Sequence, residues 1–244
     1  MDNNIVDLEM FPIRLIVFDS YFKSIEPNGI SPTEEQKEEM VSIIDKRVSY
    51  YSEGLKMIHK AFHQLPSCPS EYDYSKYTID LALLYILQTT SDCMVASKYY
   101  LLANQDYDKR YMRGKLKVIL NEGFKNLYGF TDKDRKKSHW GKVSEIVRFF
   151  PILTNQHRQV EELLSKQANS SSWWKKERNI EVHLDPLLLY ESRQEELNES
   201  KVMIETIQLF DALDIVEQFV RNQHACLTNW LNQLYLQHSE LSKE

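Results

Sequence analysis

The chain has 244 residues, of which 42% are hydrophobic and 27% charged, and its formal net charge at pH 7 is −6. This composition is typical of soluble globular proteins, and the length suffices for one large domain with a buried core. The acidic balance argues against a broad surface that coats nucleic acid, because such a surface neutralises many phosphates with basic side chains.

The first elements in chain order are an N-terminal segment and a long helix. Residues 5–25 are apolar and fit either a strand or a buried helix, so we expect residues 1–30 to form a segment packed on the main domain. Ser31 as N-cap, Pro32 at the first helical position and Glu34 three residues after the cap predict the start of a helix. Apolar residues at helical spacing continue it to the break at Pro66–Pro69.

Helical spacing predicts most of the remaining chain, and only 6 Gly and 7 Pro leave few places for turns. Gly129 is suited to a left-handed C-terminal cap, and Pro151 ends the basic and then apolar segment before it. The expected helices cover 74–104, 107–128, 131–150, 155–166, 173–184 and 198–238. The sequence therefore predicts an all-α fold, a bundle of long antiparallel helices that forms a single domain over residues 31–244.

Cellular context follows from what the sequence lacks. There is no run of 18 apolar residues and no basic start followed by an apolar stretch, so we expect no membrane span and no secretory signal. The three cysteines, Cys68, Cys93 and Cys226, are far apart and indicate reduced thiols in a cytoplasmic protein. The many tyrosines between Tyr72 and Tyr111 follow helical faces and are expected in the core or between helices.

The stretch from Arg178 to His183 contains the strongest candidates for catalytic residues in the sequence. A guanidinium can hold a phosphate through two parallel hydrogen bonds, and an imidazole can move a proton near neutral pH. Asn179 and His183 are four residues apart and share a helix face, whereas Arg178 points about 140° away from His183 on an ideal helix. A two-fold dimer would ease this separation, because Arg178 and His183 could then come from both subunits.

An arginine, a polar residue directly after it and a histidine four to six residues from the arginine, late in an all-α bundle, resemble the HEPN superfamily. Arg178 and His183 match the two defining positions, and Asn179 matches the favoured polar position. The resemblance implies a HEPN-like four-helix core with additional helices. It further implies a metal-independent endoribonuclease of toxin or antiphage type that acts as a homodimer on RNA without a cofactor.

Catalysis at this motif would be transesterification. His183 would act as general base on the ribose 2′-hydroxyl or as acid to the leaving oxygen, and Arg178 would bind the scissile phosphate. Asn179 would orient the imidazole or bind a phosphate oxygen. Around these catalytic candidates, the expected RNA-binding residues are Trp173, Trp174, Lys175 and Lys176, and Glu122 on an earlier helix is a candidate partner for Arg178.

Each of these residues also has a purely structural interpretation. Tandem tryptophans are commonly core or interface anchors, lysine pairs commonly lie on a solvated helix face, and Glu122 could be a solvated glutamate. His59 and His63 have the spacing of metal ligands. The residues between them include Lys60 but no glutamate, so we expect no metal site. The competing functional class is a non-catalytic interaction or scaffold protein, an antitoxin or immunity type of homodimer with a cognate protein partner.

Overall fold

The computed structural model describes residues 33–61, 67–170, 182, 190–191 and 199–241, and this part of the chain is an all-α bundle, as predicted. No strand occurs among these residues. The long helices are α2 (Glu34–Ala61), α3 (Glu71–Leu102), α4 (Asp106–Leu127) and α10 (Glu199–Leu241). Between α4 and α10 lie α5 (Asp132–Lys137), α6 (His139–Glu145), the 3-10 turns η2 (Val147–Phe149) and η3 (Pro151–Leu153), and α7 (Thr154–Ser170). The predicted N-terminal segment 1–30 and the predicted helix 173–184 fall outside the described ranges, apart from residue 182.

Side-chain contacts fix the direction of the helices. The ammonium of Lys98 on α3 lies 2.6 Å from Asp45 Oδ1 on α2, and these two helices run antiparallel. Helix α4 returns along α3, so that Tyr85 Oη donates a hydrogen bond of 2.8 Å to the carbonyl oxygen of Gly123. Helix α10 also runs against α3, since its Trp230 ring lies 6.2 Å from the ring of Tyr72 near the start of α3. Helices α4 and α10 therefore run in the same direction.

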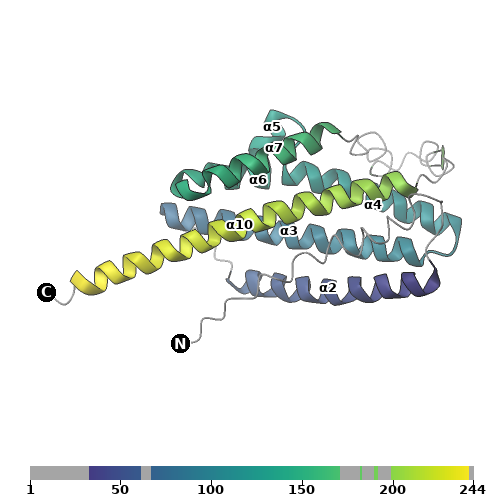
Figure 1. Ribbon diagram of the computed structural model, residues 1–244, viewed down its shortest axis with the longest axis horizontal. Coiled ribbons are helices and arrows are strands. Elements are labelled where there is room, and N and C mark those ends of the chain that lie inside the picture. Colours follow the sequence, from purple (N-terminus) through teal and green to yellow (C-terminus); the bar gives the residue numbers. More distant parts are fainter. Residues whose placement is uncertain (1–32, 62–66, 171–181, 183–189, 192–198, 242–244) are drawn as a thin grey trace.

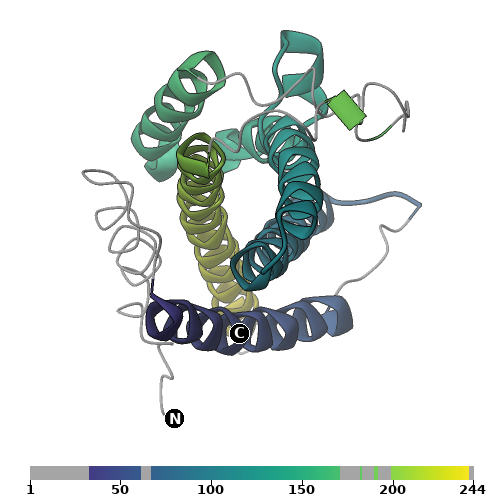
Figure 2. The same cartoon turned by 90° about the vertical axis from the view of Figure 1, so that its right-hand side faces the viewer.

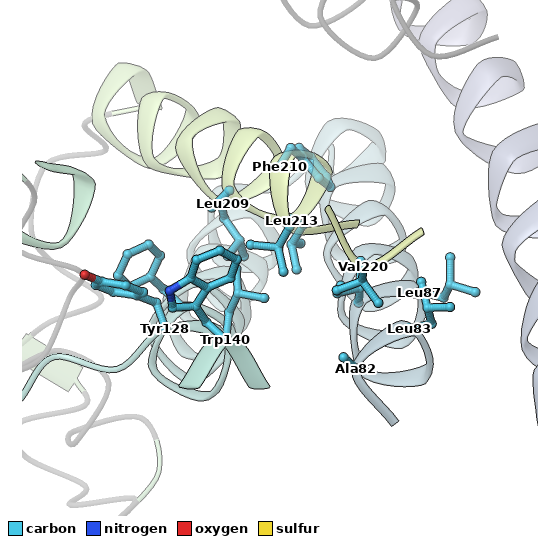
Figure 3. Close-up of a cluster of buried hydrophobic side chains, with 14 of the residues drawn as sticks. Ala82, Leu83, Leu87, Tyr128, Trp140, Leu209, Phe210, Leu213 and Val220 are labelled. Carbon is cyan, nitrogen blue, oxygen red and sulfur yellow. The ribbon is translucent and has the colours of Figure 1, made fainter. Parts of the chain in front are cut away.

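The elements form layers around a shared core. Helix α2 lies on one side of α3, α4 and α10, and α5, α6 and α7 lie on the opposite side (Figures 1 and 2). Figure 3 shows how side chains from α3, α10 and the Tyr128–Trp140 region meet between these layers. The largest fully buried side chains are Trp140, Tyr128, Phe124 and Phe219. Burial of such rings is the main favourable term in the folding of the bundle.

Gly129 ends α4 as the sequence predicts. Its φ of +89° is a left-handed conformation that side chains with a Cβ rarely adopt. Its backbone N–H donates to the carbonyl oxygen of Phe124 at 3.3 Å, which satisfies a carbonyl of the last helical turn. The prediction for the start of α2 was wrong by two residues, because the helix begins at Glu34 and the carbonyl oxygen of Thr33 accepts its first backbone bond, from Lys37.

The predicted helix over 131–150 is broken into α5, α6 and η2, which corrects the prediction of one continuous helix. The break is at Ser138, whose extended backbone (φ −69°, ψ 165°) ends α5 and starts α6. Its side chain accepts a hydrogen bond from the backbone N–H of Gly141 at 3.1 Å and donates one to the carbonyl oxygen of Arg135. Ser138 thus caps both helices, and local hydrogen bonds of this kind compete with helix continuation.

Helix α3 is the one described helix that is long and apolar enough to cross a membrane by length and composition. The bundle buries 67% of its most apolar window, and it contacts α2, α4, α6 and α10. Packing in the core therefore accounts for its apolar composition.

Candidate functional site

The motif residues predicted from the sequence lie outside the described residues. This holds for Arg178, Asn179 and His183 and also for Trp173, Trp174, Lys175 and Lys176. Glu122 is described and lies on α4, the helix predicted for it, with a half-buried side chain whose Oε1 atom is fully buried. Its proposed contact with Arg178 stays a prediction.

The described part of the chain contains polar groups that sequence reasoning missed, on the same helix as Glu122. Arg113, Lys117 and Asn121 follow one another at four-residue spacing on α4 and are only 4%, 2% and 4% exposed. We call these three residues the buried polar face of α4. They lie in phase with Leu120 and Phe124, which are fully buried in the core. A helix repeats every 3.6 residues, so all five side chains point toward the interior of the bundle.

Burying two cations is costly unless they have partners, and none of the three residues on this face is without one. Further along α4, a Cβ on Gly123 would lie only 3.1 Å from a methyl carbon of Leu209 on α10. Because α4 and α10 run in the same direction, residues that precede Gly123 on α4 lie toward the start of α10. That start carries Glu205, a carboxylate only 4% exposed. Arg113 and Lys117 therefore lie toward the end of the bundle that carries Glu205.

A second polar cluster joins α7 to the segments around it. The Glu161 carboxylate accepts a hydrogen bond of 2.7 Å from Tyr128 Oη and another from Trp140 Nε1. One guanidinium nitrogen of Arg135 lies 3.7 Å from it. Burial, followed by the bond to Glu161, raises the pKa of Tyr128 to about 12, so this phenol keeps its proton and remains a donor. The donors that surround Glu161 identify it as a structural anchor rather than a base open to substrate.

His157, one turn before Glu161 on α7, forms a serine–histidine pair with Ser144. His157 Nε2 lies 2.8 Å from Ser144 Oγ. The serine hydroxyl also donates to the carbonyl oxygen of Trp140 at 2.7 Å, so its proton points to the backbone rather than to the imidazole. This arrangement disfavours a nucleophilic serine here. The His157 ring is also stacked on Trp140 at 5.0 Å, and burial lowers its pKa.

His139 at the start of α6 is another histidine that the sequence did not single out. Its ring stacks on Tyr85 with 4.2 Å between centroids and 13° between planes. Burial, with a smaller contribution from Lys142, lowers the pKa of His139 from 6.5 to about 4. The neutral ring therefore packs α6 against α3 at neutral pH, and its role is structural.

In the described ranges, no group of three His, Cys, Asp or Glu residues could hold a metal ion. His59 is exposed on α2, and its predicted neighbour His63 falls in a gap of the description. The three cysteines are free thiols; burial raises the pKa of Cys93 to about 12, which makes this thiol inert.

One end of the α3–α4 hairpin exposes a group of aromatic and aliphatic side chains, which we call the tyrosine-rich surface. It consists of Val95, Tyr99, Leu102, Tyr107 and Tyr111, which are 37% to 63% exposed. The expectation that the tyrosines lie in the core or between helices is therefore wrong for Tyr99, Tyr107 and Tyr111. It is right for Tyr85 and Tyr100, which pack into the bundle.

Comparison with protein-family models, with curated proteins and with solved structures finds no match to this chain.

Proposed function

We propose that this protein is a HEPN-like endoribonuclease that cleaves RNA by attack of the 2′-hydroxyl, without a metal ion. The observation that carries the proposal is the spacing of Arg178, Asn179 and His183 in a chain whose described part is an all-α bundle. The described residues offer two other candidate catalytic groups, and neither is arranged for catalysis. Glu161 is surrounded by hydrogen-bond donors, and the Ser144–His157 pair has the wrong proton arrangement for a nucleophile.

The reaction needs a base, an acid and a cation. His183 takes the proton of the 2′-hydroxyl, the 2′-oxygen bonds to phosphorus, and the 5′-oxygen leaves with a proton from a second acid. The second acid is a water molecule, so each site needs one His183 and one Arg178. Arg178 binds the phosphate and offsets the charge that grows on its oxygens in the transition state. The products are a 2′,3′-cyclic phosphate and a 5′-hydroxyl, and no electron transfer occurs.

The helical geometry of the motif favours a site shared between two subunits. Arg178 and His183 diverge by about 140° on one helix, so one copy presents them poorly to a single phosphate. In a homodimer, Arg178 of one chain can serve the His183 of the other chain.

The test uses purified protein and labelled single-stranded RNA in the presence of a chelator. We expect cleavage by the wild type and at least a ~100-fold loss for Arg178→Ala and for His183→Ala. Matched controls are Arg158→Ala on α7 and His224→Ala on α10, both exposed, and these should keep full activity. Full activity in His183→Ala would refute the catalytic role of the motif, as would dependence of cleavage on an added metal ion.

Mixing the two inactive variants tests the shared site. If Arg178 and His183 come from different subunits, a mixed dimer of Arg178→Ala and His183→Ala contains one intact site. Random exchange should then restore about one quarter of the wild-type activity. If each site draws both residues from one chain, the mixture stays inactive.

The tyrosine-rich surface favours a second candidate, a non-catalytic interaction protein. Tyrosine is enriched among residues that dominate binding energy at protein interfaces, and Tyr99 and Tyr107 are more than half exposed. The same RNA assay separates the two candidates, because an interaction protein would leave RNA intact in the wild type as well as in the variants.

A further inference from the structure

A cavity of about 280 Å³ lies where α10 passes the start of α3 and the turns η2 and η3. Its lining residues are Glu71, Ser75, Phe149, Phe150, Leu227 and Trp230. We call it the α3–α10 cavity. Its volume is close to the lower limit of small-molecule pockets, which is roughly 300 Å³.

The walls of the cavity are fixed by packing and capping. Ser75, Phe150 and Leu227 are 2%, 6% and 3% exposed, so the floor is part of the core. The first turn of α3 is held by a capping box, in which Ser70 and Asp73 exchange backbone and side-chain hydrogen bonds of 2.9 and 3.2 Å. A cavity that is already formed requires little ordering of the protein when a ligand binds.

Three of the six lining residues are aromatic, and two are polar. The rings of Phe150 and Trp230 can attract a cation as well as apolar groups. The polar groups are the Glu71 carboxylate and the Ser75 hydroxyl. The salt bridges found among the described residues do not include Glu71, so its charge is available to a ligand.

The charged side chains near the cavity determine which ligand charge it favours. Glu71 is the one charged residue among those that line the cavity, and Glu145 accepts a hydrogen bond of 3.2 Å from Tyr74 Oη, next to the lining residue Ser75. Against these two carboxylates stands Arg148, whose guanidinium lies over the ring of Phe149 at 4.8 Å. The local excess is therefore negative, which disfavours carboxylates and phosphates.

We propose that the α3–α10 cavity binds a small organic ammonium ion with an aromatic or alkyl body. The ammonium group pairs with Glu71, and the body lies between the rings of Phe150 and Trp230. This site is independent of the proposed ribonuclease motif, since its lining residues belong to α3, η2, α10 and Phe150.

Isothermal titration of the full chain with phenethylammonium, which is protonated at neutral pH, tests the proposal. We expect one saturable site per chain and no binding of 3-phenylpropionate, which has a similar body and the opposite charge. Glu71→Gln should weaken binding by about tenfold, the worth of one charge-assisted hydrogen bond. The matched control Glu38→Gln, an exposed glutamate on α2, should bind like the wild type.

Filling the cavity gives a second arm of the test. Ser75→Leu places an apolar side chain into the cavity and should abolish binding, with circular dichroism to verify that the helices remain. Absence of saturable binding to the wild type would overturn the proposal. So would equal affinity for the anion, or unchanged affinity in Glu71→Gln.

Discussion

Acid should weaken the packing of α6 on α3 through a single histidine, His139. Its pKa of about 4 in the folded chain lies below its value of 6.5 without the protein environment. Below 6.5 the unfolded chain takes up a proton that the folded chain resists, so stability falls as the pH drops. The difference of about 2.5 pKa units corresponds to about 3 kcal/mol lost between neutral pH and pH 4.

The perturbation that isolates this effect is His139→Phe. Phenylalanine keeps a flat ring against Tyr85, which the histidine ring contacts at 4.2 Å, but cannot take up a proton. Burial also lowers the pKa of His157, and hydrogen bonds from Ser70 lower that of Asp73, whereas burial raises that of Asp211. These groups are present in both proteins, so their effects cancel in the comparison.

Urea unfolding followed by far-ultraviolet circular dichroism is the assay, because the signal of an all-α chain is large. The free energy of unfolding should fall by about 3 kcal/mol more in the wild type than in His139→Phe when the pH is lowered from 7 to 4. Equal losses in the two proteins would refute the assigned role of His139. A variant that is much less stable at neutral pH would show that the ring stack needs the imidazole itself.

The remaining predictions concern the junction of α5, α6 and α7. Gly141→Ala should cost about 3 kcal/mol or more in thermal unfolding, because its Cβ would lie 2.1 Å from the backbone oxygen of Arg135, where no flexible side chain can yield. An unchanged melting temperature would contradict this close approach. Glu161→Ala removes the acceptor of two buried donors and should cost about 2 to 4 kcal/mol in urea unfolding. The exposed neighbour Glu162→Ala is the control, and equal effects of the two substitutions would show that the donors find water instead.

Helix positions were predictable from the sequence because local signals mark them. The Gly129 cap and the apolar spacing of α3, α4 and α10 depend on residues close in the chain, and the structure confirms them. The break at Ser138 was missed because a serine inside an otherwise helical segment looks neutral. Its effect depends on the backbone of Gly141 lying against Arg135, which helical spacing does not reveal.

Buried polar residues were harder to foresee than helices. Arg113, Lys117 and Asn121 stand in phase with Leu120 and Phe124, and that phase was a signal available in the sequence. It was overlooked because charged residues are usually assigned to solvated faces. The motif around Arg178 and His183 remains a prediction, since these residues lie outside the described part of the chain.

Helix α10 extends beyond the bundle, and Figure 1 shows its C-terminal part projecting past the ends of the other helices. Its 43 residues span about 65 Å, and the 11 residues that follow Trp230 cover about 16 Å of this length. The relative direction of two such projections depends on how two copies of the chain assemble. In a two-fold dimer the two projections point the same way or opposite ways, depending on the axis. A pair of spin labels near residue 240 would therefore report the symmetry of the proposed dimer from outside the bundle.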